Sequence, residues 1–150
     1  MEKAKKHNVE ILLPTDYITA SSFSRDADSG YATDQDGIPD EWLGLDCGQK
    51  SIEKFNQAIK QSKTILWNGP AGVFEFPKFA GGSISMLDAC IEAAKSGSTV
   101  IVGGGDTATC TSPTLPLRLL DLVFLFISFL VCFALVRWLI VSGCAEWEGG

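Results

Sequence analysis

Three short apolar runs, separated by helical patterns, constrain the fold of this 150-residue chain more than any other feature. The runs are Val9–Pro14, Thr64–Trp67 and Thr99–Gly103, and each is aliphatic or β-branched without polar alternation. Continuous apolar runs of this length are typical of strands that are covered on both faces. The order strand, helix, strand, helix, strand predicts parallel pairing, because each crossover helix packs back on a face of the sheet. We therefore expect an α/β fold.

Two segments between these runs carry the apolar spacing of amphipathic helices. In residues 51–62 the apolar positions recur at i, i+3 and i+7, and Ser51 is the expected N-cap. In residues 83–97 a second apolar stripe follows a serine that serves as N-cap, and Gly97 is placed to end the helix. The segment Ala20–Gly48 is rich in Asp, Ser and Gly, so we expect an excursion with little regular structure or with small β pieces.

Charge and cysteine content exclude several classes of protein. The formal net charge is −6 and the isoelectric point is about 4.7, so the chain lacks the basic footprint of a nucleic-acid-binding protein. The five cysteines are odd in number and form no CxxC pair, which argues against a disulfide framework or a zinc site. Scattered single cysteines of this kind fit a reducing compartment.

Two glycine-containing loops follow apolar runs at the position where open parallel sheets bind their ligands, beyond the carboxyl ends of the strands. The second of them, GGGDTAT, follows Val102. Its glycines let the backbone approach an anion closely. Asp106 is a good N-cap, and a carboxylate beside a phosphate invites Mg²⁺ between them. The same residues also fit a tight strand-to-helix turn with Asp106 only as its cap. The pattern is not a Walker A loop, because the chain contains no GxxxxGK[ST].

The first loop, NGPAGVFEF, follows Trp67 and has the composition of a turn. Alone, it also fits a bare hairpin or a strand-to-helix turn. Glu75 lies there in an otherwise apolar setting, where its carboxylate is suited to accept hydrogen bonds from a ribose or simply to face solvent.

Four blocks in this order resemble phosphoglycerate kinase. They are Ile11–Ala20, Gly44–Gly48, Trp67–Phe76 and Gly103–Cys110, and the intervals between them carry no obvious insertion or gap. The resemblance covers residues 1–110 and implies a partial Rossmann-like parallel sheet, part of the C-terminal, nucleotide-binding domain of that family.

The resemblance implies a kinase that transfers a phosphoryl group between 1,3-bisphosphoglycerate with ADP and 3-phosphoglycerate with ATP, in glycolysis and in the cytoplasm. Its cofactors are ATP or ADP and Mg²⁺. By position, the resemblance implies that Gly44 lies at the adenine pocket and that Asn68, Gly69 and Pro70 line the nucleotide. It implies that the Glu75 carboxylate binds the ribose hydroxyls. The phosphate and magnesium loop that it implies is Gly104, Gly105, Asp106 and Thr107, with Asp106 as the carboxylate on the metal side.

The resemblance also implies that catalysis is incomplete in this chain. The family has a separate N-terminal domain that binds 3-phosphoglycerate, and no part of residues 1–110 resembles it. Phosphoryl transfer depends on positioning and electrostatic stabilisation by the whole site. We therefore expect that this chain alone is not a competent kinase and that 3-phosphoglycerate binds only through the missing domain.

From Thr111 onwards the composition changes and the resemblance ends. Residues 122–136 hold no charge, and extension to Val141 adds only Arg137, which gives the length of a possible membrane helix at 122–141. The tail, 111–150, is therefore expected to be a divergent apolar helical segment. It fits a membrane anchor, or a segment without an evolved role that arose from splicing, intron read-through or a faulty gene prediction. The rival functions are a non-enzymatic, tail-anchored nucleotide-binding or interaction protein and an unstable truncated product.

Overall fold

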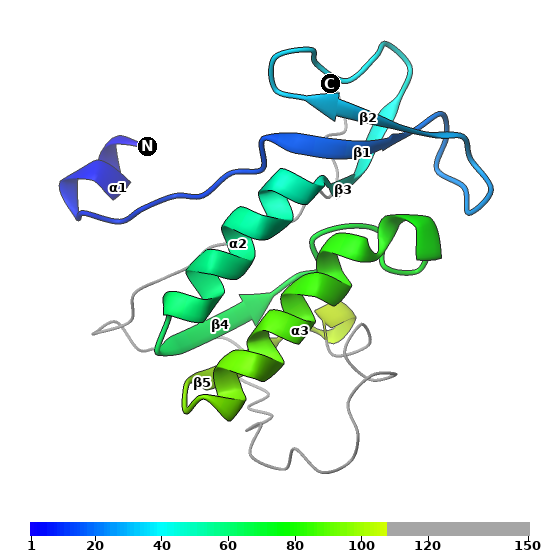
Figure 1. Cartoon of the computed structure of the whole chain (residues 1–150). Helices are drawn as coiled ribbons and strands as arrows, with labels where there is room; N and C mark the ends of the chain where they lie inside the picture. The colour runs from blue at the N-terminus through cyan, green and yellow to red at the C-terminus, as the bar shows by residue number, and fades with distance from the viewer. Residues whose placement is uncertain (108–150) are drawn as a thin grey trace.

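The computed structural model describes residues 1–107, and these form two small sheets and two long helices (Figure 1). The elements in chain order are α1 (Glu2–Lys6), β1 (Asp16–Ala20), β2 (Ser29–Thr33), β3 (Leu43–Cys47), α2 (Gln49–Gln61), β4 (Thr64–Asn68), a 3-10 turn η1 (Pro77–Phe79), α3 (Gly81–Lys95) and β5 (Thr99–Gly103). The α/β class is confirmed.

The parallel sheet consists of β4 and β5, with Thr64 opposite Thr99 and Asn68 opposite Gly103. Both predicted strands and their parallel pairing are confirmed. Helices α2 and α3 pack side by side on one face of this sheet (Figure 1). The larger core lies there and includes Phe55 and Ile59 from α2, Met86, Leu87 and Cys90 from α3, and Ile65, Trp67 and Val100 from the strands.

Within residues 1–107, coverage of both faces of the parallel sheet, which the continuous apolar runs predict, is not seen. Ile65 and Val102 are buried, whereas Leu66 and Ile101, which point to the opposite face, are only half-buried. The reason is that α2 and α3 cover the same face of β4 and β5, and the described residues place no helix on the other.

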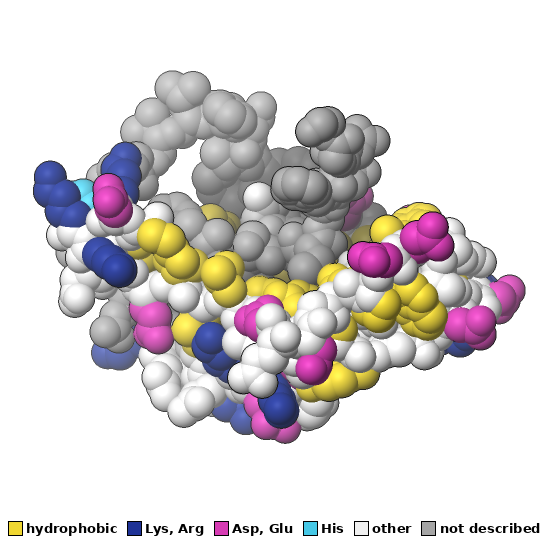
Figure 2. Space-filling view, turned by 90° about the horizontal axis from the view of Figure 1, so that it is seen from above, with side chains coloured by type: hydrophobic (Ala, Val, Ile, Leu, Met, Phe, Trp, Pro, Cys, Tyr) yellow, Lys and Arg dark blue, Asp and Glu magenta, His cyan; other side chains and the backbone are white. Residues whose placement is uncertain are grey.

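The strand predicted at Val9–Pro14 is wrong, because this segment has no regular secondary structure. A strand needs a partner along its length, and the contacts here are of another kind. Leu12 packs against the larger core, and the carbonyl of Leu13 accepts a hydrogen bond from the Lys54 ammonium at 3.4 Å. Val9, Ile11 and Leu13 are exposed. Figure 2 shows hydrophobic side chains at the surface of the face it presents, among charged ones.

The predicted excursion contributes β2 and β3 to a three-stranded antiparallel sheet in the order β2-β1-β3. The expectation of small β pieces in Ala20–Gly48 is therefore confirmed. A second, smaller core of Ala20, Ala27, Leu45 and Phe79 joins this sheet to the turn η1. Phe76 packs at its border and meets Phe23 with ring centroids 5.2 Å apart.

The start of α2 differs from the prediction. Gly48 is the N-cap, and Ser51 lies within the first turn, fully buried. The capping group comes from β1: the Asp16 carboxylate accepts hydrogen bonds from the amides of Lys50 at 3.0 Å and Ser51 at 2.8 Å and from the Ser51 hydroxyl. Burial alone would raise the pKa of Asp16, but these hydrogen bonds and one from the Tyr31 hydroxyl lower it on balance. Asp16 therefore stabilises the fold above its ordinary pKa of 3.8, and this contribution is lost as the pH falls below that value.

The start of α3 is capped in the same way by a carboxylate from β3. Ala80 is the N-cap residue, so neither serine of the predicted start serves as cap. Asp46 is 2% exposed and accepts hydrogen bonds from the amides of Gly82 and Cys47, both at 2.8 Å. Here burial dominates and raises the pKa of Asp46, against the hydrogen bonds that lower it. The predicted end of the helix at Gly97 is confirmed, with φ +95° just after the C-cap Ser96.

The predicted boundary at residues 110 and 111, the divergent tail 111–150 and the possible membrane helix 122–141 lie outside the described residues. Within residues 1–107, none of the helices has the length and apolar character needed to cross a membrane.

Candidate nucleotide site

The two glycine-containing loops leave the same edge of the parallel sheet. Asn68 and Gly103, the last residues of β4 and β5, are direct partners in the register. Gly69 has φ +100° and Gly104 has φ +87°, so each strand ends in a turn that favours glycine. A Cβ on Gly104 would stand 2.7 Å from Oδ1 of Asn68, which shows that the first loop lies directly against the second.

The backbone amides of the first loop are engaged within the protein. The Gly69 amide donates to the Thr107 hydroxyl at 2.7 Å. The amides of Ala71 and Gly72 donate to the Ser83 hydroxyl of α3 at 3.0 and 3.3 Å. Val73 donates to the carbonyl of Leu45 in β3 at 2.9 Å, and Pro70 has no amide hydrogen. The first loop is therefore held in place by hydrogen bonds within the protein, and the amides named here already have acceptors.

The second loop is the more open of the two. Gly104, Gly105 and Asp106 are exposed, while Thr107 is fully buried. The chain is helical from Gly105, so Asp106 lies in the first turn and is not the N-cap that the sequence predicts. The physical reason is the positive φ of Gly104, which ends β5 so that the helix begins one residue earlier than the sequence predicts.

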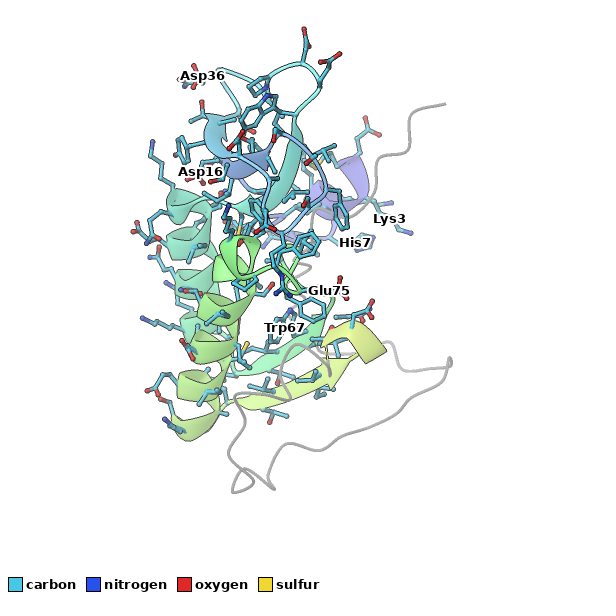
Figure 3. All side chains as sticks on the ribbon, turned by 90° about the vertical axis from the view of Figure 1, so that its right-hand side faces the viewer. Lys3, His7, Asp16, Asp36, Trp67 and Glu75 are labelled. Atoms are coloured by element: carbon cyan, nitrogen blue, oxygen red, sulfur yellow. The ribbon has the colours of Figure 1, made fainter. Side chains whose placement is uncertain are left out.

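Of the remaining predicted residues, Pro70 and Glu75 belong to the first loop and Gly44 lies in β3. Glu75 is exposed and lies on the side of the molecule away from α2 (Figure 3). Pro70 is half-buried within the first loop. Gly44 belongs to the antiparallel sheet, where it pairs with Thr19. Its neighbour Leu45 accepts the hydrogen bond from Val73, which connects β3 to the loop after β4.

The chemistry of the second loop fits magnesium only together with a phosphate ligand. Within residues 1–107, no group of three or more His, Cys, Asp and Glu side chains is arranged to hold a metal ion. Magnesium in phosphate-transfer sites is commonly held by one or two carboxylates, with the remaining ligands from phosphates and water. The single exposed carboxylate of Asp106, beside two glycines, fits that arrangement.

Sequence reasoning missed the residues that hold these loops in place. Asp46 and Ser83 anchor the start of α3 and the first loop, and the Trp67 indole nitrogen donates to the Gly69 carbonyl at 2.7 Å. A single aspartate between apolar residues in GLDCG is a signal of a buried, partnered carboxylate. The serine and the tryptophan carry no comparable signal.

Comparisons with known proteins found matches in sequence and in fold. The sequence model of the family described as "Phosphoglycerate kinase" matches residues 1–116. The phosphoglycerate kinase of Funneliformis mosseae is 67% identical over 109 residues, and that of Neurospora crassa is 62% identical over 109 residues. Each alignment covers 73% of this chain and 26% of the relative. The chain therefore spans about a quarter of the length of these curated relatives.

Two solved structures have the same fold. Phosphoglycerate kinase from Coxiella burnetii superposes with a TM-score of 0.68 and 36% identity over 75% of this chain and 28% of that protein. The enzyme from Pyrococcus horikoshii gives a TM-score of 0.55 with 23% identity, over 67% of this chain and 24% of that protein, which is a likeness of fold alone.

Proposed function

The chain belongs to the phosphoglycerate kinase family, and from this premise we propose that the edge formed by its two loops binds a magnesium-bound adenine nucleotide, ATP or ADP. The observation that carries the proposal is the 2.7 Å hydrogen bond from the Gly69 amide to the Thr107 hydroxyl. This hydrogen bond joins the first loop, after β4, to the glycine-rich second loop, after β5. Both loops lie at the sheet edge where α/β folds bind ligands.

Each predicted residue has a part in this proposal. The backbone of Gly104, Gly105 and Thr107 would hold the phosphates, and the Asp106 carboxylate would hold Mg²⁺. Asn68, Gly69 and Pro70 line the nucleotide. The Glu75 carboxylate accepts hydrogen bonds from the ribose hydroxyls, and Gly44 in β3 lies at the adenine pocket. The exposure of Gly104, Gly105, Asp106 and Glu75 supports this assignment, because a ligand reaches them from solvent.

The reaction proposed for the complete family member is phosphoryl transfer between 1,3-bisphosphoglycerate with ADP and 3-phosphoglycerate with ATP, a step of glycolysis in the cytoplasm. Bound Mg²⁺ supplies neutralisation of phosphate charge. The residues of this chain hold and orient the nucleotide. The 3-phosphoglycerate site is proposed to lie in the part of the relatives that this chain does not span.

We expect the isolated chain to show no turnover with ATP and 3-phosphoglycerate. The reason is that phosphoryl transfer requires both substrates to be held in line, and the chain spans only 26% of its relatives. A coupled ADP-release assay on the full chain measures this. Rates comparable to those of an intact family enzyme would contradict the expectation.

We expect the Asp106→Asn variant to bind MgADP about tenfold more weakly than the wild-type chain, because it loses the charge that faces the metal. Calorimetric titration of the full chain with ADP measures the effect, once with Mg²⁺ and once with EDTA. The variant should bind metal-free ADP at least as tightly as the wild type, because it lacks the negative charge that repels the phosphates when no metal is bound. Asp88→Asn is the matched control, since Asp88 is exposed on α3.

Two results would contradict parts of this proposal separately. A wild-type chain that shows no saturable binding of ADP with or without Mg²⁺ contradicts nucleotide binding by this chain. A wild-type chain that binds MgADP, with Asp106→Asn indistinguishable from it, contradicts only the metal role of Asp106.

A further inference from the structure

One face of the parallel sheet is left without a helix by residues 1–107. Helices α2 and α3 pack on the face that carries Ile65 and Val100, and Figure 3 shows both helices on the same side of β4 and β5. Because successive side chains of a strand point to opposite faces, Leu66 and Ile101 lie on the other face. Both are half-buried and belong to neither core, although half-buried side chains of α2 and α3 pack against the larger one.

Leu66 and Ile101 form the apolar centre of this open face. They are direct partners in the register of β4 and β5, and a second pair, Thr64 with Thr99, flanks them towards the start of the strands. In α/β folds, parallel sheets are covered on both faces because helices pack on each side. The open face, defined by these four residues, therefore has the character of a surface that a further segment covers.

We propose that the apolar run 122–136 of this chain docks on the open face and contacts Leu66 and Ile101. The occupant of the face is thus a segment of the same chain, in place of a lipid bilayer or a second copy. The docking residues differ from those of the two loops, so the inference goes beyond the proposed function and does not depend on it.

The composition and length of the run fit the open face. Its 15 residues carry no charge, and Ser128 is the only polar residue among them. Even when coiled as tightly as an α-helix, a run of this length extends over about 22 Å, whereas a strand of the length of β4 or β5 spans about 17 Å. The run is therefore long enough to cover the face along both strands. It is shorter than the about 20 apolar residues that a bilayer span needs, and Arg137 follows it directly, so the sheet is the better fitting partner.

The run is also tethered close to the open face. Residues 108–121, which are 14 residues, connect it to Thr107, and Thr107 lies four residues beyond the end of β5. A connection of 14 residues reaches up to about 48 Å, which is ample for a return along the strands. Covalent attachment gives the run an effective concentration on the order of millimolar at the face. A second copy has no such advantage, which favours docking within one chain.

The test places a photo-crosslinking residue on the open face of the full chain. We expect Ile101→p-benzoylphenylalanine, after irradiation, to form crosslinks to residues 122–136 of the same chain, which mass spectrometry of the digested protein identifies. Leu66→p-benzoylphenylalanine repeats the measurement from the neighbouring strand, in case the first variant does not fold. Ile84→p-benzoylphenylalanine is the matched control, because Ile84 is an isoleucine of α3 that is 48% exposed, and it should lack these crosslinks.

Mixing isotope-labelled with unlabelled chains, and adding phosphatidylcholine vesicles, distinguishes the possible occupants. Crosslinks within one chain that persist in the presence of vesicles support the inference. Crosslinks that join a labelled to an unlabelled chain mean that a second copy covers the face, and crosslinks to phosphatidylcholine in place of the run mean that a bilayer does. Crosslinks only to residues outside 122–136, or none from either residue 66 or residue 101, mean that the run does not cover the face. Each of the last three results overturns the inference, and none of them bears on nucleotide binding.

Discussion

The Asp46→Ala variant is expected to lose about 3 kcal/mol of unfolding free energy, a large share of the stability of a small domain. The Asp46 carboxylate is 2% exposed and accepts the amides of Gly82 and Cys47 at 2.8 Å. Truncation to alanine removes the acceptor of the buried Gly82 amide at the start of α3. Urea denaturation of the full chain, followed by circular dichroism, measures the loss as a lower midpoint.

Asp88→Ala is the control for this substitution, because Asp88 is an exposed aspartate on the same helix. We expect its unfolding midpoint to stay close to that of the wild type. Asp46→Asn should fall between alanine and wild type, since an amide accepts hydrogen bonds through one oxygen only. If Asp46→Ala unfolds within about 0.5 kcal/mol of the wild type, the carboxylate is not the cap that fixes α3.

The pH dependence of the same comparison has a defined sign. Because burial raises the pKa of Asp46, the folded protein holds a proton there at pH values where the unfolded chain has released it. The contribution of this group to stability is therefore full below its ordinary pKa of 3.8 and declines as the pH rises from there through the raised value. The difference between wild type and Asp46→Ala should accordingly be larger at acid pH than at neutral pH.

The strands of the parallel sheet could be predicted from sequence because their signals are local. Thr64–Trp67 and Thr99–Gly103 are short apolar runs on either side of a helical pattern, and the crossover rule supplies their parallel pairing. The run Val9–Pro14 carries the same local signal and is not a strand. Strand formation depends on a partner backbone, and a sequence pattern does not show whether one lies alongside.

The caps and the link between the loops could not be predicted, because they join residues far apart in the chain. Asp16 and Ser51 are 35 residues apart, Asp46 and Gly82 are 36 apart. A serine near the start of each helix is the expected local cap, yet in both helices a strand aspartate supplies the acceptor. The turns at the candidate site, in contrast, depend on glycine at fixed local positions, so the sequence showed them directly.

The Gly82→Ala variant is expected to lose at least about 2 kcal/mol of unfolding free energy, because a Cβ at this position has no room. It would stand 2.6 Å from the Cys47 sulfur and would overlap the Asp46 carboxylate. Gly82, Cys47 and Asp46 are all buried, so the neighbours are not flexible ends that can move aside cheaply. The urea midpoint of the full chain measures the loss.

Gly81→Ala is the matched control, one residue earlier in the same helix. The nearest atom to its added Cβ is Oδ2 of Asp46 at 3.7 Å, which is ordinary van der Waals contact. Alanine is the better helix former, so this variant should be neutral or up to about 1 kcal/mol more stable. The opposite signs at adjacent glycines separate steric overlap from helix propensity, and a similar small effect at both positions would contradict the steric account.

A double-mutant cycle then connects the two predictions. In the Asp46→Ala background the carboxylate is absent, so an alanine at residue 82 no longer overlaps it, and the close approach to the Cys47 sulfur remains. The double variant should therefore lose less stability than the two single losses added together. Additive losses would mean that Gly82 is required for a reason other than the close approach of the Asp46 carboxylate. Since the start of α3 also holds the first loop through the Ser83 hydroxyl, both single variants should weaken MgADP binding as well.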